Sequence, residues 1–182
     1  MTLPVRRHVL VDVDGVLADF DRGFLHLWRT AHPDRPWLAP AARRHFYLRE
    51  DYPPAWRDAV QAVIDAPGFY RQLPVMAGAQ AALAALAARG YRLTVCTSPG
   101  ATLAERRAWL AEHFGPALAQ GMLACADKTQ VDGDWLIDDN PAPSGARAPR
   151  WRHIVFDQPY NRHVPGLRLN WQNWAQHWPE SG

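Results

Sequence analysis

The sequence predicts an α/β fold: a Rossmann-like, open and mainly parallel sheet with helices on both faces, and a small helical cap inserted after the first strand. Three observations predict it. Short runs that are apolar on both faces recur along the chain, as in strands covered on both sides. Helical stretches separate most of these runs. A segment rich in proline and tryptophan, without a strand pattern, follows the first run.

Length and composition suit a single folded domain. The chain has 182 residues, of which 48% are hydrophobic and 21% charged, close to the averages for globular proteins. Its formal net charge of +2 gives no strong attraction to a nucleic-acid polymer or a membrane surface. Cys96 and Cys125 lie in apolar segments, which is typical of buried thiols in a reducing compartment.

No membrane or export segment is expected. No stretch reaches the roughly 18 consecutive apolar residues that a membrane helix needs. Asp12 and Asp14 interrupt the apolar run that follows the N-terminal arginines, so this run does not resemble a signal peptide. We therefore expect a cytoplasmic protein with no nucleic-acid polymer and no membrane as partner.

Strands and helices alternate along the predicted core. The strands are expected over residues 7–12, 91–97, 121–125, 135–138 and 152–157. One helix is expected over 77–90, ending at Gly90, and another over 101–115, ending at Gly115. The second helix has its predicted stripe at Leu103, Arg107, Leu110 and Phe114.

Two further segments belong to the predicted core. Residues 140–149 are rich in turn-forming residues and predict a loop. In the tail, Trp171, Trp174 and Trp178 follow helical spacing. We expect a helix stripe that faces the core, because no basic groove accompanies these rings to make a platform for bases.

The segment 20–75 differs in composition from the rest. It holds seven of the sixteen prolines. Helices are expected near 20–31 and 55–66, the first with Phe20, Phe24, Leu27 and Trp28 along one stripe. We interpret 20–75 as a helical cap and residues 1–19 and 76–182 as the α/β core.

The apolar run of the first strand stops on two acids, in the stretch "DVDG". Residues i and i+2 of an extended chain point to the same side, so Asp12 and Asp14 are expected to face one pocket. Crowded carboxylates repel, and a divalent cation or a shared proton relieves the repulsion. With a hard cation such as Mg²⁺, one acid can be an ionised nucleophile and the other a proton donor. The alternative is a pair of solvated acids that end a strand.

Polar residues follow other predicted strands as well. Thr97 and Ser98 offer groups that suit a phosphate, and Lys128 offers a positive charge. Asp138 and Asp139 are a second pair of acids after an apolar run. Each of these has an ordinary explanation alone. Because ligands of open α/β sheets bind at the carboxyl ends of the strands, their order along the chain indicates one phosphate and metal site.

These stretches resemble a known enzyme family. The motifs "DVDGVLADF", "CTSP", "DK" and "LIDDN" are similar to the four motifs of haloacid dehalogenase superfamily phosphatases. Within that superfamily the chain resembles the 5'(3')-deoxyribonucleotidases, through "LADF", "RRHFY" and "CTSP". The resemblance covers most of the chain, including an insert in the expected place.

The resemblance implies a role for each motif residue. Asp12 matches the nucleophile that forms an aspartyl phosphate, and Asp14 matches the acid that protonates the leaving oxygen and then activates water. Mg²⁺ is expected on the Asp12 carboxylate, the Asp14 backbone carbonyl and Asp139, with Asp138 as a neighbouring or alternative ligand. The phosphate oxygens are expected to contact Thr97, Ser98 and Lys128.

In the family, aromatic side chains of the cap surround the base. Phe20, Phe46 and Tyr47 fall on these positions, with Leu48 alongside. For Phe20 and Phe46, packing within the cap core is an equally good explanation. Ile64 stands where the family has a tryptophan, which leaves the base preference open.

The resemblance implies a Mg²⁺-dependent phosphatase of pyrimidine 5'- or 3'-deoxynucleoside monophosphates, with a homodimer implied by analogy. A second hypothesis keeps the chemistry but has a sugar phosphate or another small phosphomonoester as substrate. A third is a ligand-binding domain without catalysis. The third is disfavoured because Asp12, Asp14, Lys128 and the pair Asp138–Asp139 are all present.

Overall fold

The computed structural model describes residues 7–100 and 102–179. The outer ends of the predicted core (1–6 and 180–182), and position 101 at the start of one predicted helix, lie outside the described residues. Within the described residues the sheet has six strands in the order β3-β2-β1-β4-β5-β6, and all neighbours pair in parallel. The strands are β1 (His8–Val11), β2 (Arg92–Thr97), β3 (Leu123–Ala124), β4 (Trp135–Asp138), β5 (Arg152–Phe156) and β6 (Arg168–Leu169).

The predicted fold class is confirmed. Strand β1 lies in the middle of the sheet, where Val11 pairs with Val95 of β2 and Ile137 of β4. Its apolar residues Val9, Leu10 and Val11 are fully buried. A central parallel strand has cover on both faces, which explains why its sequence is continuously apolar rather than alternating.

The two faces of the sheet have different covers. On one face, Val9 and Val11 join a large core cluster that includes Leu86 and Trp109. These two belong to helices α3 (Ala79–Ala88) and α4 (Leu103–Phe114). On the other, Leu10 packs with a smaller group made of Cys96, Leu136, Trp151, Cys125 and Val131. This second cover comes mainly from the segments around the short 3₁₀ helix η5 (Lys128–Gln130) and the loop before β5.

The predicted helices are largely confirmed. Helix α1 (Phe20–Ala31) has the predicted bounds, and the helix expected over 55–66 is η3 (Pro54–Trp56) followed by α2 (Arg57–Ile64). Gly90 and Gly115 follow α3 and α4 in the left-handed φ region, as helix-terminating glycines do. Among the described residues, no helix combines the length and apolar character needed to cross a membrane.

The stripe expected in α4 was partly wrong. Leu110 is buried as predicted, and Leu103 and Phe114 pack against the core while partly buried. Arg106 and Trp109, and not Arg107, complete the buried side of this helix. Its Arg107 instead donates to the carbonyl groups of Ala119 and Met122 (2.6 and 3.2 Å). These contacts place the Arg107 side chain at the end of α5 (Pro116–Gln120). The sequence did not predict this helix.

The tail is less helical than predicted. Helix α6 is only Trp174–His177, although Trp171, Trp174 and Trp178 are all buried as expected. The side chains of Asn170 and Asn173 each accept a hydrogen bond from the other residue's backbone N–H (3.0 and 2.8 Å). Asn side chains that bond the local backbone compete with helix formation, so the chain makes turns before α6.

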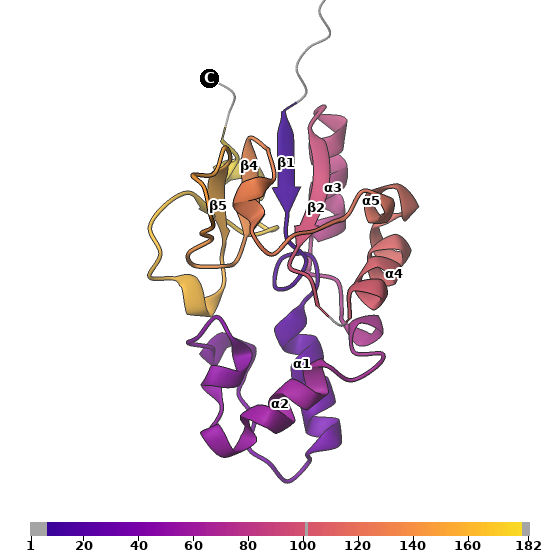
Figure 1. The fold of residues 1–182 in the computed structure, drawn as a ribbon, viewed down its shortest axis with the longest axis vertical. Helices are drawn as coiled ribbons and strands as arrows, with labels where there is room; N and C mark the ends of the chain where they lie inside the picture. The colour runs from indigo at the N-terminus through magenta and orange to yellow at the C-terminus, as the bar shows by residue number, and fades with distance from the viewer. Residues whose placement is uncertain (1–6, 101, 180–182) are drawn as a thin grey trace, which may run out of the picture.

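The segment between β1 and α3 lies beyond the carboxyl end of β1, where Figure 1 shows α1 and α2. Phe24 and Trp28 of α1 pack against Tyr52, with ring centroids 5.9 and 5.2 Å from it. The division into a core and a cap at the expected boundaries stays a prediction. The remaining short 3₁₀ helices of this segment are η1 (Pro40–Ala42), η2 (Leu48–Asp51) and η4 (Tyr70–Gln72), and a further one, η6 (Pro159–Asn161), follows β5.

Candidate active site

The turn after β1 brings two acids to the edge of the sheet. The Asp12 N–H donates to the Ile137 carbonyl (3.0 Å), which extends the pairing of β1 by one residue. The chain then folds back, and the N–H groups of Leu17 and Ala18 donate to the Val13 carbonyl (2.8 and 2.9 Å). Gly15 has a φ of +72°, and a Cβ there would collide with the Asp139 carboxylate. Glycine is therefore required both by the turn and by the closeness of the second acidic pair.

Residues of this turn line a cavity of about 590 Å³. Side chains from the strand ends and from the segment 20–75 line it together, so residues far apart in sequence meet in one place. All of the site residues predicted from the sequence line it: Asp12, Asp14, Phe20, Phe46, Tyr47, Leu48, Thr97, Ser98, Lys128, Asp138 and Asp139.

Three carboxylates form a compact group in the cavity. Asp12, Asp138 and Asp139 each offer an oxygen, and these oxygens lie within 4.8 Å of one another. The Lys128 ammonium lies 2.8 Å from Asp12 Oδ1 and 2.6 Å from Asp138 Oδ2. The donor chemistry fits Mg²⁺, which prefers hard oxygen ligands and is usually held by a few carboxylates.

Burial disfavours the ionised form of these carboxylates, and nearby positive charge opposes this effect. Burial raises the pKa of Asp12, opposed by the nearby Lys128 ammonium. It also raises the pKa of Asp139 well above the usual value, and the neighbouring Asp138 adds to the effect. For Lys128, burial alone would lower the pKa, but Asp12 and Asp138 outweigh it and raise the pKa above its usual range. A bound cation or a shared proton would relieve the repulsion among these carboxylates.

Asp14 lies apart from these three carboxylates and has its own partners. The Tyr70 hydroxyl donates to the Asp14 carboxylate (2.8 Å), and Arg106 Nη2 lies 3.0 Å from Asp14 Oδ2. Burial raises the pKa of Asp14, opposed by the Arg106 guanidinium. Its side chain is still 33% exposed, so it can reach a molecule in the cavity.

The sequence did not point to Arg106. Its guanidinium donates to Thr97 Oγ1 (2.8 Å) and to the Ser98 carbonyl (2.6 Å), and it also bonds the Tyr70 hydroxyl. It therefore orders the predicted phosphate loop after β2. A signal was present, because Arg106 shares the buried side of α4 with Trp109 and Leu110, and a buried arginine needs partners.

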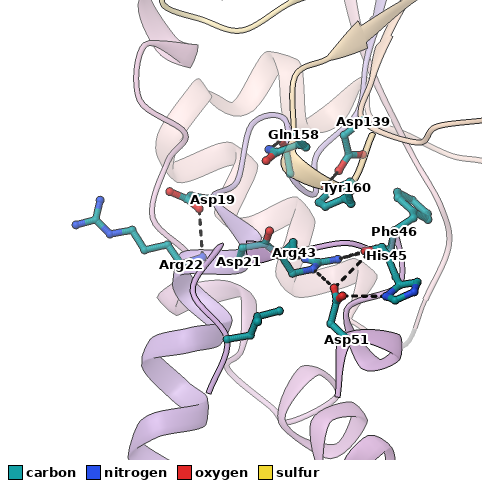
Figure 2. A network of polar contacts seen from close by, with 12 residues as sticks. Asp19, Asp21, Arg22, Arg43, His45, Phe46, Asp51, Asp139, Gln158 and Tyr160 are labelled. Atoms are coloured by element: carbon teal, nitrogen blue, oxygen red, sulfur yellow. Dashed lines mark hydrogen bonds and ion pairs between the residues drawn. The ribbon is translucent and has the colours of Figure 1, made fainter. Parts of the chain in front are cut away.

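The aromatic side of the cavity comes from the loop before η2. Phe46 contacts Tyr160 with ring centroids 6.0 Å apart. Figure 2 shows the two side chains near each other. Tyr47 is 62% exposed, whereas Leu48 is buried. Ile64, at the position that is aromatic in the family, also lines the cavity.

Comparison with known proteins decides the family. A family model described as "5' nucleotidase, deoxy (Pyrimidine), cytosolic type C protein" matches residues 6–178. The chain belongs to this family. It is therefore a phosphoric monoester hydrolase.

Several relatives match nearly the whole chain. A Bordetella pertussis protein named "Putative 5'(3')-deoxyribonucleotidase" is 44% identical over 171 residues, covering 91% of this chain and 92% of its own. The human cytosolic-type 5'(3')-deoxyribonucleotidase is 37% identical over 183 residues, covering 94% and 91%.

Solved structures support the fold of this family member. A HAD family hydrolase from Deinococcus radiodurans R1, with bound phosphate and sodium, aligns with a TM-score of 0.57 and 16% identity over 90% of both chains. At that identity the likeness concerns the fold alone. It agrees with the α/β fold described above.

Proposed function

We propose that the protein is a Mg²⁺-dependent phosphatase of deoxynucleoside monophosphates, with pyrimidine nucleotides as preferred substrates. One observation carries the proposal: a single cavity contains the acidic group, the cations Lys128 and Arg106, and the aromatic loop residues Phe46 and Tyr47. The acids and cations suit a phosphate ester, and the rings suit a planar base. The names of the relatives point to the same substrate class.

Asp12 is the proposed nucleophile. Its carboxylate oxygen attacks phosphorus and forms an aspartyl phosphate, while the bond between phosphorus and the ester oxygen breaks. Asp14 gives its proton to that leaving oxygen and then takes a proton from the water that cleaves the aspartyl phosphate. Burial, which raises the pKa of Asp14, favours the protonated form that the first step needs.

The phosphate needs positive charge beside an anionic nucleophile. Lys128 lies 2.8 Å from Asp12 Oδ1, so it can contact both the nucleophile and a phosphate oxygen. Arg106 holds the loop of Thr97 and Ser98 through its contacts and places a second cation in the cavity. When bound, Mg²⁺ would neutralise further charge on the phosphate and on Asp12.

Asp12 and Asp139 are the proposed carboxylate ligands of Mg²⁺. Both oxygens of Asp138 already have partners: Oδ2 accepts from Lys128 (2.6 Å) and Oδ1 from the Asn140 N–H (2.8 Å). Asp138 is therefore better placed to orient Lys128 and the loop after β4 than to bind the ion directly. The expected contribution of the Asp14 backbone carbonyl remains part of this proposal.

Phosphate release from a panel of phosphomonoesters tests the proposed function. With Mg²⁺ we expect dUMP or dTMP to have the highest kcat/KM, and deoxyribose 5-phosphate to be roughly tenfold or more worse, because it lacks the base that contacts the rings. Removing the metal with EDTA should abolish release, and added Mg²⁺ should restore it. A preference for sugar phosphates by orders of magnitude would refute the nucleotide assignment, and an EDTA-insensitive enzyme would refute the metal requirement.

A further inference from the structure

Arg43 lies at the centre of a polar network between the aromatic loop and the strand ends (Figure 2). Its guanidinium is clamped between two acids: Nη1 pairs with Asp21 of α1, and Nε donates to Asp51 Oδ2 of η2 (2.8 Å). Nη2 donates to the carbonyls of His45 and Phe46 (2.7 and 2.8 Å). Arg43 therefore sets the backbone path of the loop that presents Phe46 and Tyr47 to the cavity.

The Arg43 guanidinium also lies over the ring of Tyr160, which belongs to η6 after β5. Arg43 Cζ is 4.6 Å from the centroid of the Tyr160 ring, and Tyr160 also contacts Phe46. The Tyr160 hydroxyl donates to Asp139 Oδ2. The next residue, Asn161, donates from Nδ2 to the Asp139 carbonyl (2.8 Å), so Tyr160 and Asp139 are held together at two points.

The contacts thus form one continuous chain from the loop to the acidic group. We propose that Arg43 is a positioning residue that couples the loop 43–47 to the metal-ligand carboxylate Asp139 through the side chain of Tyr160. The inference rests on the proposed function for the identity of the metal and of the base. Its physical basis is that the Tyr160 ring contacts both Arg43 and Phe46 of this loop, so a shift of the loop moves the hydroxyl that orients Asp139.

The geometry requires arginine rather than any cation. Arg43 uses three nitrogens in different directions at once: toward Asp21, toward Asp51 and toward two carbonyl groups. Its Cζ also lies over the Tyr160 ring, 4.6 Å from the centroid. A lysine keeps the charge between the two acids but cannot reproduce the fork of donors, and its point charge replaces the planar cation over the ring. Arg43→Lys therefore separates positioning from simple charge balance.

The test compares Arg43→Lys, Tyr160→Phe and the double variant with the wild-type protein. Arg44→Lys is the matched control, because Arg44 is exposed and joins the network through its backbone N–H to Asp51. Tyr52→Phe is the control for removing a hydroxyl from a buried tyrosine. Calorimetric titration of the metal-free proteins with Mg²⁺ measures metal affinity, and hydrogen exchange measures the order of residues 43–47.

We expect Tyr160→Phe to weaken Mg²⁺ binding roughly tenfold, as changes to groups that orient a metal ligand do. Arg43→Lys should weaken it several-fold, speed exchange in the loop 43–47, and raise KM for dUMP more than for deoxyribose 5-phosphate. In the Tyr160→Phe background, Arg43→Lys should no longer change Mg²⁺ affinity, because the hydrogen bond from Tyr160 to Asp139 is already absent. Both controls should bind Mg²⁺ as the wild type does.

The inference is overturned if Arg43→Lys leaves Mg²⁺ affinity unchanged, even with a loosened loop. It is also overturned if the effect persists in the Tyr160→Phe background, or if the wild-type protein binds no Mg²⁺. Failure of the nucleotide assignment looks different. In that case sugar phosphates lead the substrate panel, while Mg²⁺ affinity and loop exchange still respond to Arg43→Lys.

Discussion

Asp12→Asn should abolish turnover while the fold is retained. An amide nitrogen or oxygen cannot replace a carboxylate as a nucleophile toward phosphorus, so we expect kcat to fall by roughly four to six orders of magnitude, as for other lost nucleophiles. The two side chains have nearly the same shape, and Lys128 keeps Asp138 as a partner at 2.6 Å. Phosphate release under saturating dUMP measures the loss, and circular dichroism checks the fold.

Asp132→Asn provides the matched control. Asp132 is an exposed acid that pairs with Arg147 and Arg150 on the surface, and surface ion pairs contribute little to stability. This variant should keep wild-type kcat and KM. If Asp12→Asn retained activity near that of the control, Asp12 would not be the nucleophile.

Asp14→Asn should have the second-largest effect, and the effect should depend on the leaving group. Loss of a general acid costs a factor of about 10² to 10⁴ when the leaving oxygen is a sugar alkoxide, as in dUMP. With para-nitrophenyl phosphate, whose leaving group needs little protonation, the rate of the first step should fall much less in this variant. The comparison is made by pre-steady-state kinetics, because the later cleavage of the aspartyl phosphate also depends on Asp14.

The result for Asp14 would contradict the proposal in two ways. An unchanged rate with dUMP would remove Asp14 from the chemistry altogether. An equal loss of the first step for both leaving groups would assign it to orienting the phosphate rather than to proton transfer. The contacts of its carboxylate with Tyr70 and Arg106 make this distinction worth measuring, because both groups also line the cavity.

The sheet was predictable because its signals are local. The continuous apolar run of β1 and the glycines after α3 and α4 are visible in short windows of sequence, and the structure agrees with them. Strand β6 has two residues and α5 has five, too few to give a periodic pattern. The length of the helix in the tail was overestimated. The side chains of Asn170 and Asn173 bond the local backbone in place of a helical turn, and the tryptophan spacing does not reveal these bonds.

Within the site, residues at strand ends were predictable and their tertiary partners were not. Asp12 follows β1, Asp138 ends β4 and Lys128 lies a few residues after β3, so the carboxyl-end rule places them together. Arg43 and Tyr160 come from segments without a strand or a long helix, and their meeting depends on how the loop 43–47 packs on η6. Arg106 was within reach, had the buried side of α4 been assigned correctly.

The most direct test of the account is chemical trapping of the aspartyl phosphate. The protein is quenched during turnover of dUMP with Mg²⁺ and reduced with borohydride, which converts an aspartyl phosphate to homoserine, and the peptide containing residues 8–20 is sequenced by mass spectrometry. The account predicts homoserine at position 12, only when substrate is present, and none in the Asp12→Asn protein. Homoserine at position 14 would contradict the account. An unmodified peptide would also contradict it, provided that substrate is being turned over and that a chemically prepared acyl phosphate is reduced under the same conditions.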